Sequence, residues 1–227
     1  MPTSNTRVRQ QRAERTRSLI IDTAARMFAE VGFDGVSLND LISATGMSKG
    51  AFYFHFSSKD ELALATFRVK QRELITRLQA DAEPSASASD ELCSAMRRRA
   101  RLIAGDPTMH CVVRLGADLS VRSGPGSEYA SFQELGMRSI SQLIERGVHT
   151  GEFGAHLEPR STARAIFAWV VGMDSLSLLD SGGRDLEERT EEVLALLIPA
   201  LRARPSTAPE PPIRNRTLKT NATKARN

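Results

Sequence analysis

The sequence predicts an all-α protein of about nine helices, and three observations support that prediction. Apolar residues recur at helical spacing through most of the chain, clusters of Gly, Pro and Ser separate these stretches, and no alternating apolar and polar run is typical of a strand. The chain has 227 residues, of which 41% are hydrophobic and 26% charged. This composition is ordinary for a folded protein and rules out a wholly disordered or collagen-like chain.

The first predicted helix spans residues 14–33. Its apolar residues follow the spacing i, i+4, i+7, i+8, i+11, which places them on one face of a helix with 3.6 residues per turn. Gly32 is expected to end this helix. The residues on the apolar face are Ile20, Ala24, Met27, Phe28 and Val31.

Two short helices are predicted next, over residues 37–46 and 48–56. Ser37 and Asp40 form a weak version of the capping box that starts a helix, and Gly46 is suited to end it. The apolar face of the first short helix consists of Leu38, Leu41 and Ile42.

The remaining helices are bounded by caps and breaks. Ser58 and Glu61 make a full capping box, in which the Ser oxygen accepts a backbone N–H and the Glu reaches back. They start a long helix over residues 59–82. Beyond residue 204, four prolines and six basic residues with little apolar mass predict a disordered basic tail over 204–227. The other helices are predicted over residues 89–104, 107–121, 127–150, 159–181 and 184–203. Short segments that contain Gly or Pro separate them.

The two short helices over residues 37–56 have the pattern of a helix-turn-helix, which binds DNA by placing its second helix in the major groove. Gly50 would let the backbone approach a phosphate or a base edge. The packing side of the second helix is expected to include Ala51, Phe52, Phe54 and Phe56. The other candidate DNA-binding residues are Arg15, Ser37, Ser48, Lys49, Tyr53, His55 and Lys59.

Each of these side chains has a chemical reason to contact DNA. Lys49 could donate to guanine or to a phosphate, and the Tyr53 ring could touch a thymine methyl. Ser37, at a helix start, could place its hydroxyl and backbone N–H on a phosphate with help from the helix dipole, and Lys59 is a further phosphate candidate. The alternative interpretation is that they are ordinary surface residues on a small three-helix core.

The distribution of charge agrees with a polyanionic partner. Residues 1–70 carry a formal charge of +3, residues 71–203 carry −4, and residues 204–227 carry +5. Residues 1–13 form a basic N-terminal arm, which would supply affinity for phosphates rather than a choice of sequence. The alternative is that the two basic ends of the chain are exposed to solvent and bind no partner. The arginines near the N-terminus are Arg7, Arg9, Arg12, Arg15 and Arg17.

Residues 14–74 resemble the DNA-binding domain of the TetR family of bacterial repressors. The resemblance runs through the pattern of residues 17–35, through Ala44-Thr45-Gly46-Met47-Ser48-Lys49-Gly50 and Tyr53-Phe54-His55-Phe56, and through Lys59-Asp60-Glu61-Leu62. The stretch from Lys49 to Ala63 and the segment at 114–120 are similar to the γ-butyrolactone receptors within that family. This resemblance implies a homodimer that binds a palindromic operator as double-stranded DNA and is released by a small-molecule effector.

The resemblance also implies a ligand-binding and dimerisation domain over residues 75–203. Phe132 stands where the lactone receptors carry a Trp, so another signal such as an antibiotic stays an alternative. The alternative is that the residues expected to line the pocket only pack in the hydrophobic core. These walls are Met96, Val112, Leu115, Leu119, Phe132, Leu135, Trp169 and Met173.

The last two predicted helices are expected to form the dimer interface, with packing inside one chain as the alternative. Two such pairs would make a four-helix interface. The apolar faces concerned consist of Ala163, Ile166, Phe167, Val170 and Val171, and of Val193, Leu194, Leu197, Ile198 and Leu201.

Other function classes lack their motifs. The sequence contains no G-x-S-x-G, H-E-x-x-H or P-loop pattern, and its four histidines do not have metal-ligand spacing with Cys93 and Cys111. We therefore expect no catalytic residue, metal or cofactor, although a helical enzyme and a DNA-binding protein that senses no signal remain alternatives. A signal peptide and an uninterrupted apolar span are also missing, which predicts a cytoplasmic protein beside the bacterial nucleoid, with no membrane partner.

Overall fold

The computed structural model describes residues 4–80, 85, 87–122 and 127–202, and the predicted basic tail lies outside the described residues. The described part of the chain is helical, as the sequence predicts, with one isolated bridge between Phe153 and Arg202. Its elements are α1 (Ser4–Val31), α2 (Leu38–Thr45), α3 (Lys49–Tyr53), α4 (Lys59–Ala80), α5 (Ala88–Gly105), a 3-10 turn (Pro107–Met109), α6 (His110–Arg122), α7 (Glu128–His149), α8 (Pro159–Ser181) and α9 (Leu186–Leu201).

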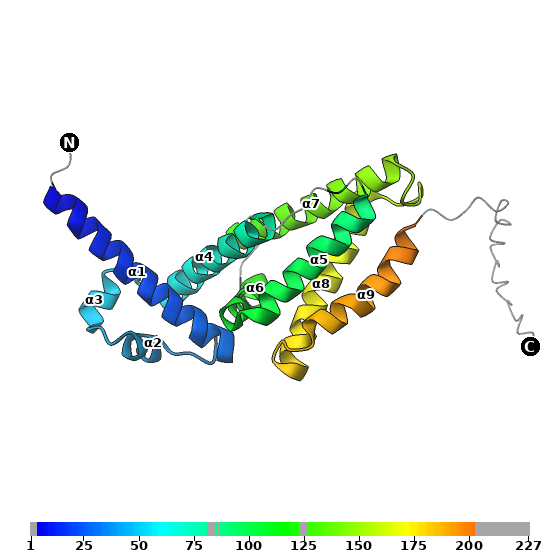
Figure 1. Ribbon diagram of the computed structural model, residues 1–227. Coiled ribbons are helices and arrows are strands. Elements are labelled where there is room, and N and C mark those ends of the chain that lie inside the picture. The colour runs from blue at the N-terminus through cyan, green and yellow to red at the C-terminus, as the bar shows by residue number, and fades with distance from the viewer. Residues whose placement is uncertain (1–3, 81–84, 86, 123–126, 203–227) are drawn as a thin grey trace, which may run out of the picture.

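The molecule is elongated, with the two short helices at one end (Figure 1). α2 and α3 lie beside α1 at that end, and α5 to α9 form a bundle at the other end. α4 runs from the small end into the bundle, and it packs on α1, α5 and α6. α2 and α3 are therefore held at an extremity that a large partner can reach.

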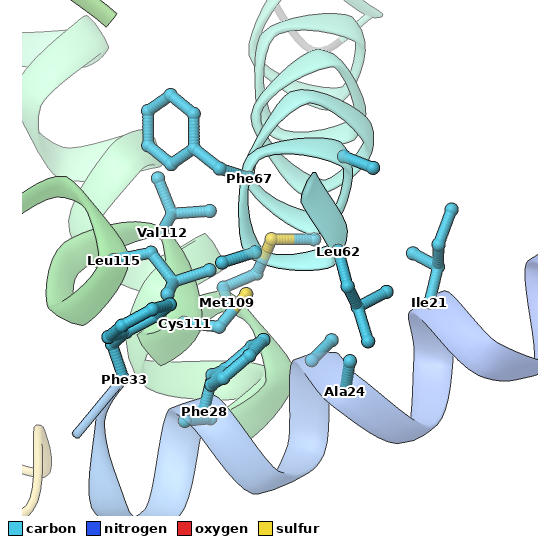
Figure 2. Close-up of a cluster of buried hydrophobic side chains, with 14 of the residues drawn as sticks. Ile21, Ala24, Phe28, Phe33, Leu62, Phe67, Met109, Cys111, Val112 and Leu115 are labelled. Carbon is cyan, nitrogen blue, oxygen red and sulfur yellow. The ribbon is translucent and has the colours of Figure 1, made fainter. Parts of the chain in front are cut away.

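One hydrophobic core joins the two ends. In Figure 2, Phe28 and Phe33 from the end of α1 lie together with Leu62 of α4 and with Met109 and Leu115 of the 3-10 turn and α6. All five side chains are buried, and each buried side chain of this size contributes on the order of 1.5–3 kcal/mol. α1 and α6 therefore pack directly against each other through this core.

A second core lies inside the bundle and corrects the expected dimer interface. Ile166 and Val170 of α8 pack with Leu194, Leu197 and Ile198 of α9 within one chain. Ala163 and Leu201 are also buried, and Phe167 and Val193 are partly buried. Most of the predicted interface is therefore intramolecular, because each helix turns its larger apolar stripe toward its neighbours in the same chain.

α5 is fixed to the rest of the bundle by arginine–carboxylate pairs. Arg97 donates from Nε and Nη2 to the two carboxylate oxygens of Glu191 in α9, at 2.6 and 2.7 Å. Arg99 makes a two-pronged pair with the buried Asp174 of α8. Paired bonds of this kind fix orientation as well as distance, so they set the order of the bundle helices.

α8 is, among the helices of the described residues, the one long and apolar enough to cross a membrane. Asp174 lies in its middle and is paired with Arg99, and the helix packs against α7 and α9. These contacts are those of a helix inside a folded bundle, where a buried carboxylate needs a partner. We therefore assign the apolar character of α8 to protein packing.

The predicted boundaries differ from the structure at three helices. α1 begins at Ser4 rather than at residue 14, so the predicted basic arm is largely helical. Apart from Val8, residues 7–15 are Arg, Gln, Glu and Ala, which are good helix formers, and this continues the helix without an apolar face. α3 ends at Tyr53 instead of Phe56, and the helix predicted from residue 107 begins with a 3-10 turn capped by Asp106.

Candidate nucleic-acid interface

The first short helix begins and ends as its sequence predicts. The backbone N–H of Asp40 donates to the Ser37 hydroxyl oxygen at 3.1 Å, and the Asp40 carboxylate accepts from the Ser37 N–H at 3.0 Å. The hydrogen bonds from the Ser37 hydroxyl and backbone hold the pKa of Asp40 below its ordinary value. Gly46 adopts a left-handed conformation with φ of 68°, which ends α2 and turns the chain toward α3.

α3 is short and is held by two phenylalanines. Ser48 caps its start by accepting the Ala51 N–H at 3.3 Å. Phe52 and Phe56 are buried against the core, with their ring centroids 6.4 Å apart. The Arg17 guanidinium lies 4.6 Å from the centroid of the Phe56 ring and ties this end of the motif to α1.

The exposed side of α3 differs in part from the prediction. Phe54 is 77% exposed and Ala51 is exposed, although both were expected on the packing side. The reason is helical geometry: Phe52 and Phe56 are four residues apart and share the core face, so Phe54 between them points the other way. Sequence reasoning missed Phe54 as a candidate because an aromatic residue within an apolar run resembles core.

The structure leaves most of the candidate DNA-binding residues open to a partner. Ser37, Ser48, Lys49, Gly50 and Tyr53 are exposed. Arg15 is exposed on α1, and the partly buried ring of His55 packs edge-on against Phe54 with the ring centroids 5.2 Å apart. Lys49 forms no ion pair or hydrogen bond with the residues that the structure describes, so its charge is available to a phosphate or base.

Lys59 is the exception, because its ammonium is used inside the fold. It donates to the carbonyl oxygens of Phe33 at 2.9 Å and Val36 at 2.8 Å, and it lies 4.0 Å from the centroid of the Phe33 ring. The phosphate contact of Lys59 stays a prediction, with two of the three N–H groups of its ammonium already used inside the fold. Its role is to close the turn between α1 and α2, and the sequence gives no signal of this long-range contact.

The capping box predicted at the start of α4 forms in a shifted way. The Glu61 N–H donates to the Ser58 hydroxyl oxygen at 3.1 Å, as predicted. The Glu61 carboxylate, however, accepts from the N–H and hydroxyl of Ser57, at 2.8 and 2.7 Å. Two adjacent serines left this choice open in the sequence, and the result fixes the chain that joins α3 to α4.

A contact between α6 and the end of α1 links the small end to the bundle. The Phe33 N–H donates to Oδ2 of Asp118 at 3.1 Å. Arg122 lies 4.4 Å from the centroid of the Phe33 ring and pairs with Asp34 at 2.5 Å. The sequence marked residues 114–120 only by resemblance, and the structure gives Asp118 a specific contact there. We call Phe33, Asp118 and Arg122 the α1–α6 contact.

The predicted pocket walls do not gather at one place. Val112, Leu115, Leu119 and Met173 are buried in the core that also holds α1, and Phe132 packs partly buried against it. Met96 belongs to the second core inside the bundle. The eight residues are therefore divided between two cores and the surface.

Leu135 and Trp169 do not line the interior of this chain. Leu135 is 58% exposed on α7 and Trp169 is 47% exposed on α8. Each points away from the packed face of its own helix, so the expectation that they form pocket walls inside the chain is wrong. A surface groove of about 660 Å³ lies nearby, and it is lined by Glu134, Met137, Arg138, Ser141, Arg160 and Arg164.

The similarity of this chain to known proteins agrees with the geometry of the small end. Residues 20–66 match the family described as bacterial regulatory proteins, tetR family. The fatty acid metabolism regulator protein of Bacillus subtilis is 22% identical over 182 residues, which cover 79% of this chain and 92% of that protein. The A-factor receptor protein of Streptomyces griseus is 25% identical over 196 residues, which cover 85% of this chain and 66% of that receptor.

A solved structure extends the likeness beyond the small end. TylP, a TetR regulator from Streptomyces fradiae, has 27% sequence identity and a TM-score of 0.60, over 85% of this chain and 89% of that one. The likeness therefore includes the bundle as well as α1 to α3. Residues 20–66 therefore match the tetR family, and most of the chain is similar to regulators of that family.

Proposed function

We propose that this protein is a repressor that binds a palindromic operator through α3 and is released by a small hydrophobic signal. The observation that carries the proposal is the arrangement of α3: two buried phenylalanines hold it rigidly, while Lys49, Gly50 and Tyr53 stay exposed. A rigid, exposed helix at the end of an elongated molecule suits the major groove, where the base edges can be told apart.

We further propose that the protein acts as a homodimer through the outer face of α8. Trp169, Leu176 and Leu179 on α8 and Leu196 on α9 are large apolar residues with exposed side chains, and Leu179 is 80% exposed. Adjacent exposed apolar residues of this size are typical of an interaction surface. A twofold dimer would present two copies of α3 to half-sites about 34–36 Å apart.

We infer the chemical class of the signal from the relatives of this chain and from the residues of the core that holds α6. The resemblance of residues 49–63 and 114–120 to lactone receptors, and the likeness to the A-factor receptor, favour a γ-butyrolactone-type signal. Another hydrophobic compound, such as an antibiotic or an acyl-chain metabolite, is the second candidate, and the likeness to a fatty acid metabolism regulator favours it. Val112, Leu115, Leu119 and Phe132 remain the proposed wall residues, since they lie on α6 and α7 beside the α1–α6 contact.

Regulation then requires that the signal bind one conformation more tightly than the other. The α1–α6 contact gives a direct path, because a ligand that displaces Leu115 or Leu119 also moves Asp118 on the same helix. A shift there alters the position of α3 and the spacing of the two reading helices. The protein would act in the bacterial cytoplasm, where the operator lies.

Footprinting with the purified full chain on the DNA upstream of its own gene tests this function. We expect protection of a palindromic site, and we expect culture extract or a synthetic γ-butyrolactone to remove it. Protection that neither addition removes would support a regulator without a signal. A failure to prefer any duplex over random competitor DNA would refute operator binding.

A further inference from the structure

We propose that Phe54 is a specificity-determining residue that contacts the C5 methyl group of a thymine in each operator half-site. This inference deepens the proposed operator binding and rests on it. Gly50 and Phe54 share one face of α3, which we call the Gly50–Phe54 face, and the methyl group would lie against the Phe54 ring on it.

The backbone places Phe54 firmly on the outward side of α3. Its N–H donates to the Gly50 carbonyl oxygen at 3.1 Å, and its φ and ψ of −65° and −28° continue the helix. Gly50 and Phe54 are four residues apart and therefore share one face. That face is opposite the buried Phe52 and Phe56.

The fold itself requires neither residue of the Gly50–Phe54 face. Phe54 is 77% exposed, so its ring contributes little to the core. A Cβ added to Gly50 would meet nothing within 4 Å, and its φ lies outside the left-handed region, so the backbone does not need glycine there. An exposed phenyl ring beside open space gains free energy when an apolar group covers it.

The ring is also held in place before any partner arrives. The His55 ring packs edge-on against it, with ring centroids 5.2 Å apart and an interplanar angle of 89°. A ring that already contacts a neighbouring ring loses less conformational freedom on binding than a free side chain does. Phe54 can therefore act as a preformed apolar contact on the reading helix.

The chemistry of the major groove identifies what this ring would touch. The thymine C5 methyl is the apolar group among the donors and acceptors that base pairs display there, and Phe is one of the side chains suited to contact it. The exposed residues Ser48, Lys49 and Tyr53, at the start of α3 and within it, carry polar groups that suit phosphates and base edges. A contact between Phe54 and deoxyribose is the competing possibility, and it would carry no choice of base.

The experiment measures the affinity of full-length protein for a duplex selected from a random pool, with each thymine replaced singly by deoxyuridine. We expect one position per half-site at which loss of the methyl weakens wild-type binding about fourfold, the size expected for burying one methyl group. Phe54→Ala should lose at least as much affinity on the thymine duplex and should show no further loss at that position. Phe54→Leu should keep part of the preference.

Val121→Ala, which removes an exposed apolar side chain from α6, serves as the matched control and should behave as wild type. A deoxyuridine scan without effect would overturn the proposal. The proposal would also be overturned if Phe54→Ala bound the thymine duplex as tightly as wild type. The same holds if deoxyuridine weakened the binding of Phe54→Ala as much as it weakens that of wild type. A wild-type protein that selects no duplex would instead overturn operator binding itself, and the two failures are thus distinguishable. Circular dichroism and the melting temperature check that Phe54→Ala stays folded.

Discussion

At the scale of single residues, burial on α3 separates structural from reading roles. Phe52 and Phe56 are buried, while Lys49 and Tyr53 are exposed. The sequence could predict Lys49 and Tyr53, because a polar group at the right phase of a short helix is visible in its spacing. It could not predict the internal role of Lys59, because the carbonyl groups it binds lie more than twenty residues earlier in the chain.

Lys49→Ala and Tyr53→Ala should each weaken operator binding about tenfold or more, because each removes a contact of the size usual for bases and phosphates. The fold should be unaffected, since neither side chain is buried. Fluorescence anisotropy with labelled operator measures the loss. Arg101→Ala, which removes an exposed cation from α5, is the matched control. Unchanged affinity in both variants would contradict the assignment of α3 as the reading helix.

Gly50→Ala should separate stability from binding. The free energy of unfolding should stay the same or rise by up to about 1 kcal/mol, since alanine favours helix over glycine and the added methyl meets no neighbour. Operator affinity should fall, because the methyl occupies the place of closest approach. Gly105→Ala at the end of α5 is the control, with equally open surroundings. Full affinity in Gly50→Ala would show that the duplex does not approach this point.

At the scale of elements, sequence and structure agree best at helix ends that are capped by residues close in the chain. The Ser37 and Asp40 capping box and the Gly46 stop form as predicted, because caps depend on residues three or four apart. A helix cap supplied by a residue far away in the sequence could not be predicted. The start of α5 is held by Glu152, which follows α7 and accepts from the backbone N–H groups of Ala88 and Ser89, each at 3.1 Å.

Acid should weaken the start of α5. Hydrogen bonds led by the Ser89 N–H keep the pKa of Glu152 below its ordinary value in the folded protein. Its contribution to stability is therefore complete above the unfolded pKa and is lost as the pH falls through the lower folded pKa.

Glu152→Gln should cost about 1 kcal/mol at pH 7, the usual size of a cap, and should lose less stability than wild type on acidification. Urea denaturation at pH 7 and pH 3.5 measures both effects. Equal stability of the two proteins at both pH values would show that this cap contributes nothing.

At the scale of the whole molecule, the sequence could predict the helical fold and the division into a small end and a bundle. It could not assign the apolar stripes of α8 and α9, because burial inside one chain and burial between two chains have the same sequence pattern. In the structure, Ile166 and Leu197 are buried in the core of one chain, whereas Leu179 is exposed. It also shows why a pocket could not be located from apolar residues alone, since Met96 and Val112 enter different cores.

Leu179→Glu should convert the proposed dimer to monomer, because a charge without a partner in a buried interface costs several kcal/mol. The monomer should keep its helical content, as Leu179 is 80% exposed within one chain. Analytical ultracentrifugation gives the mass of each species. Val121→Glu on α6 is the control and should sediment as wild type. A Leu179→Glu protein of unchanged mass would place the dimer contact elsewhere.

The fluorescence of Trp169 can report whether the outer face of α8 is covered. It is the one tryptophan of the chain, and half of its indole is open to water in a single chain. Its emission should therefore shift to shorter wavelength when a second subunit covers it and return to longer wavelength on dilution. Unlabelled protein would then report its own association constant in a cuvette, and adding operator or signal to the same sample would reveal whether assembly is linked to either of them.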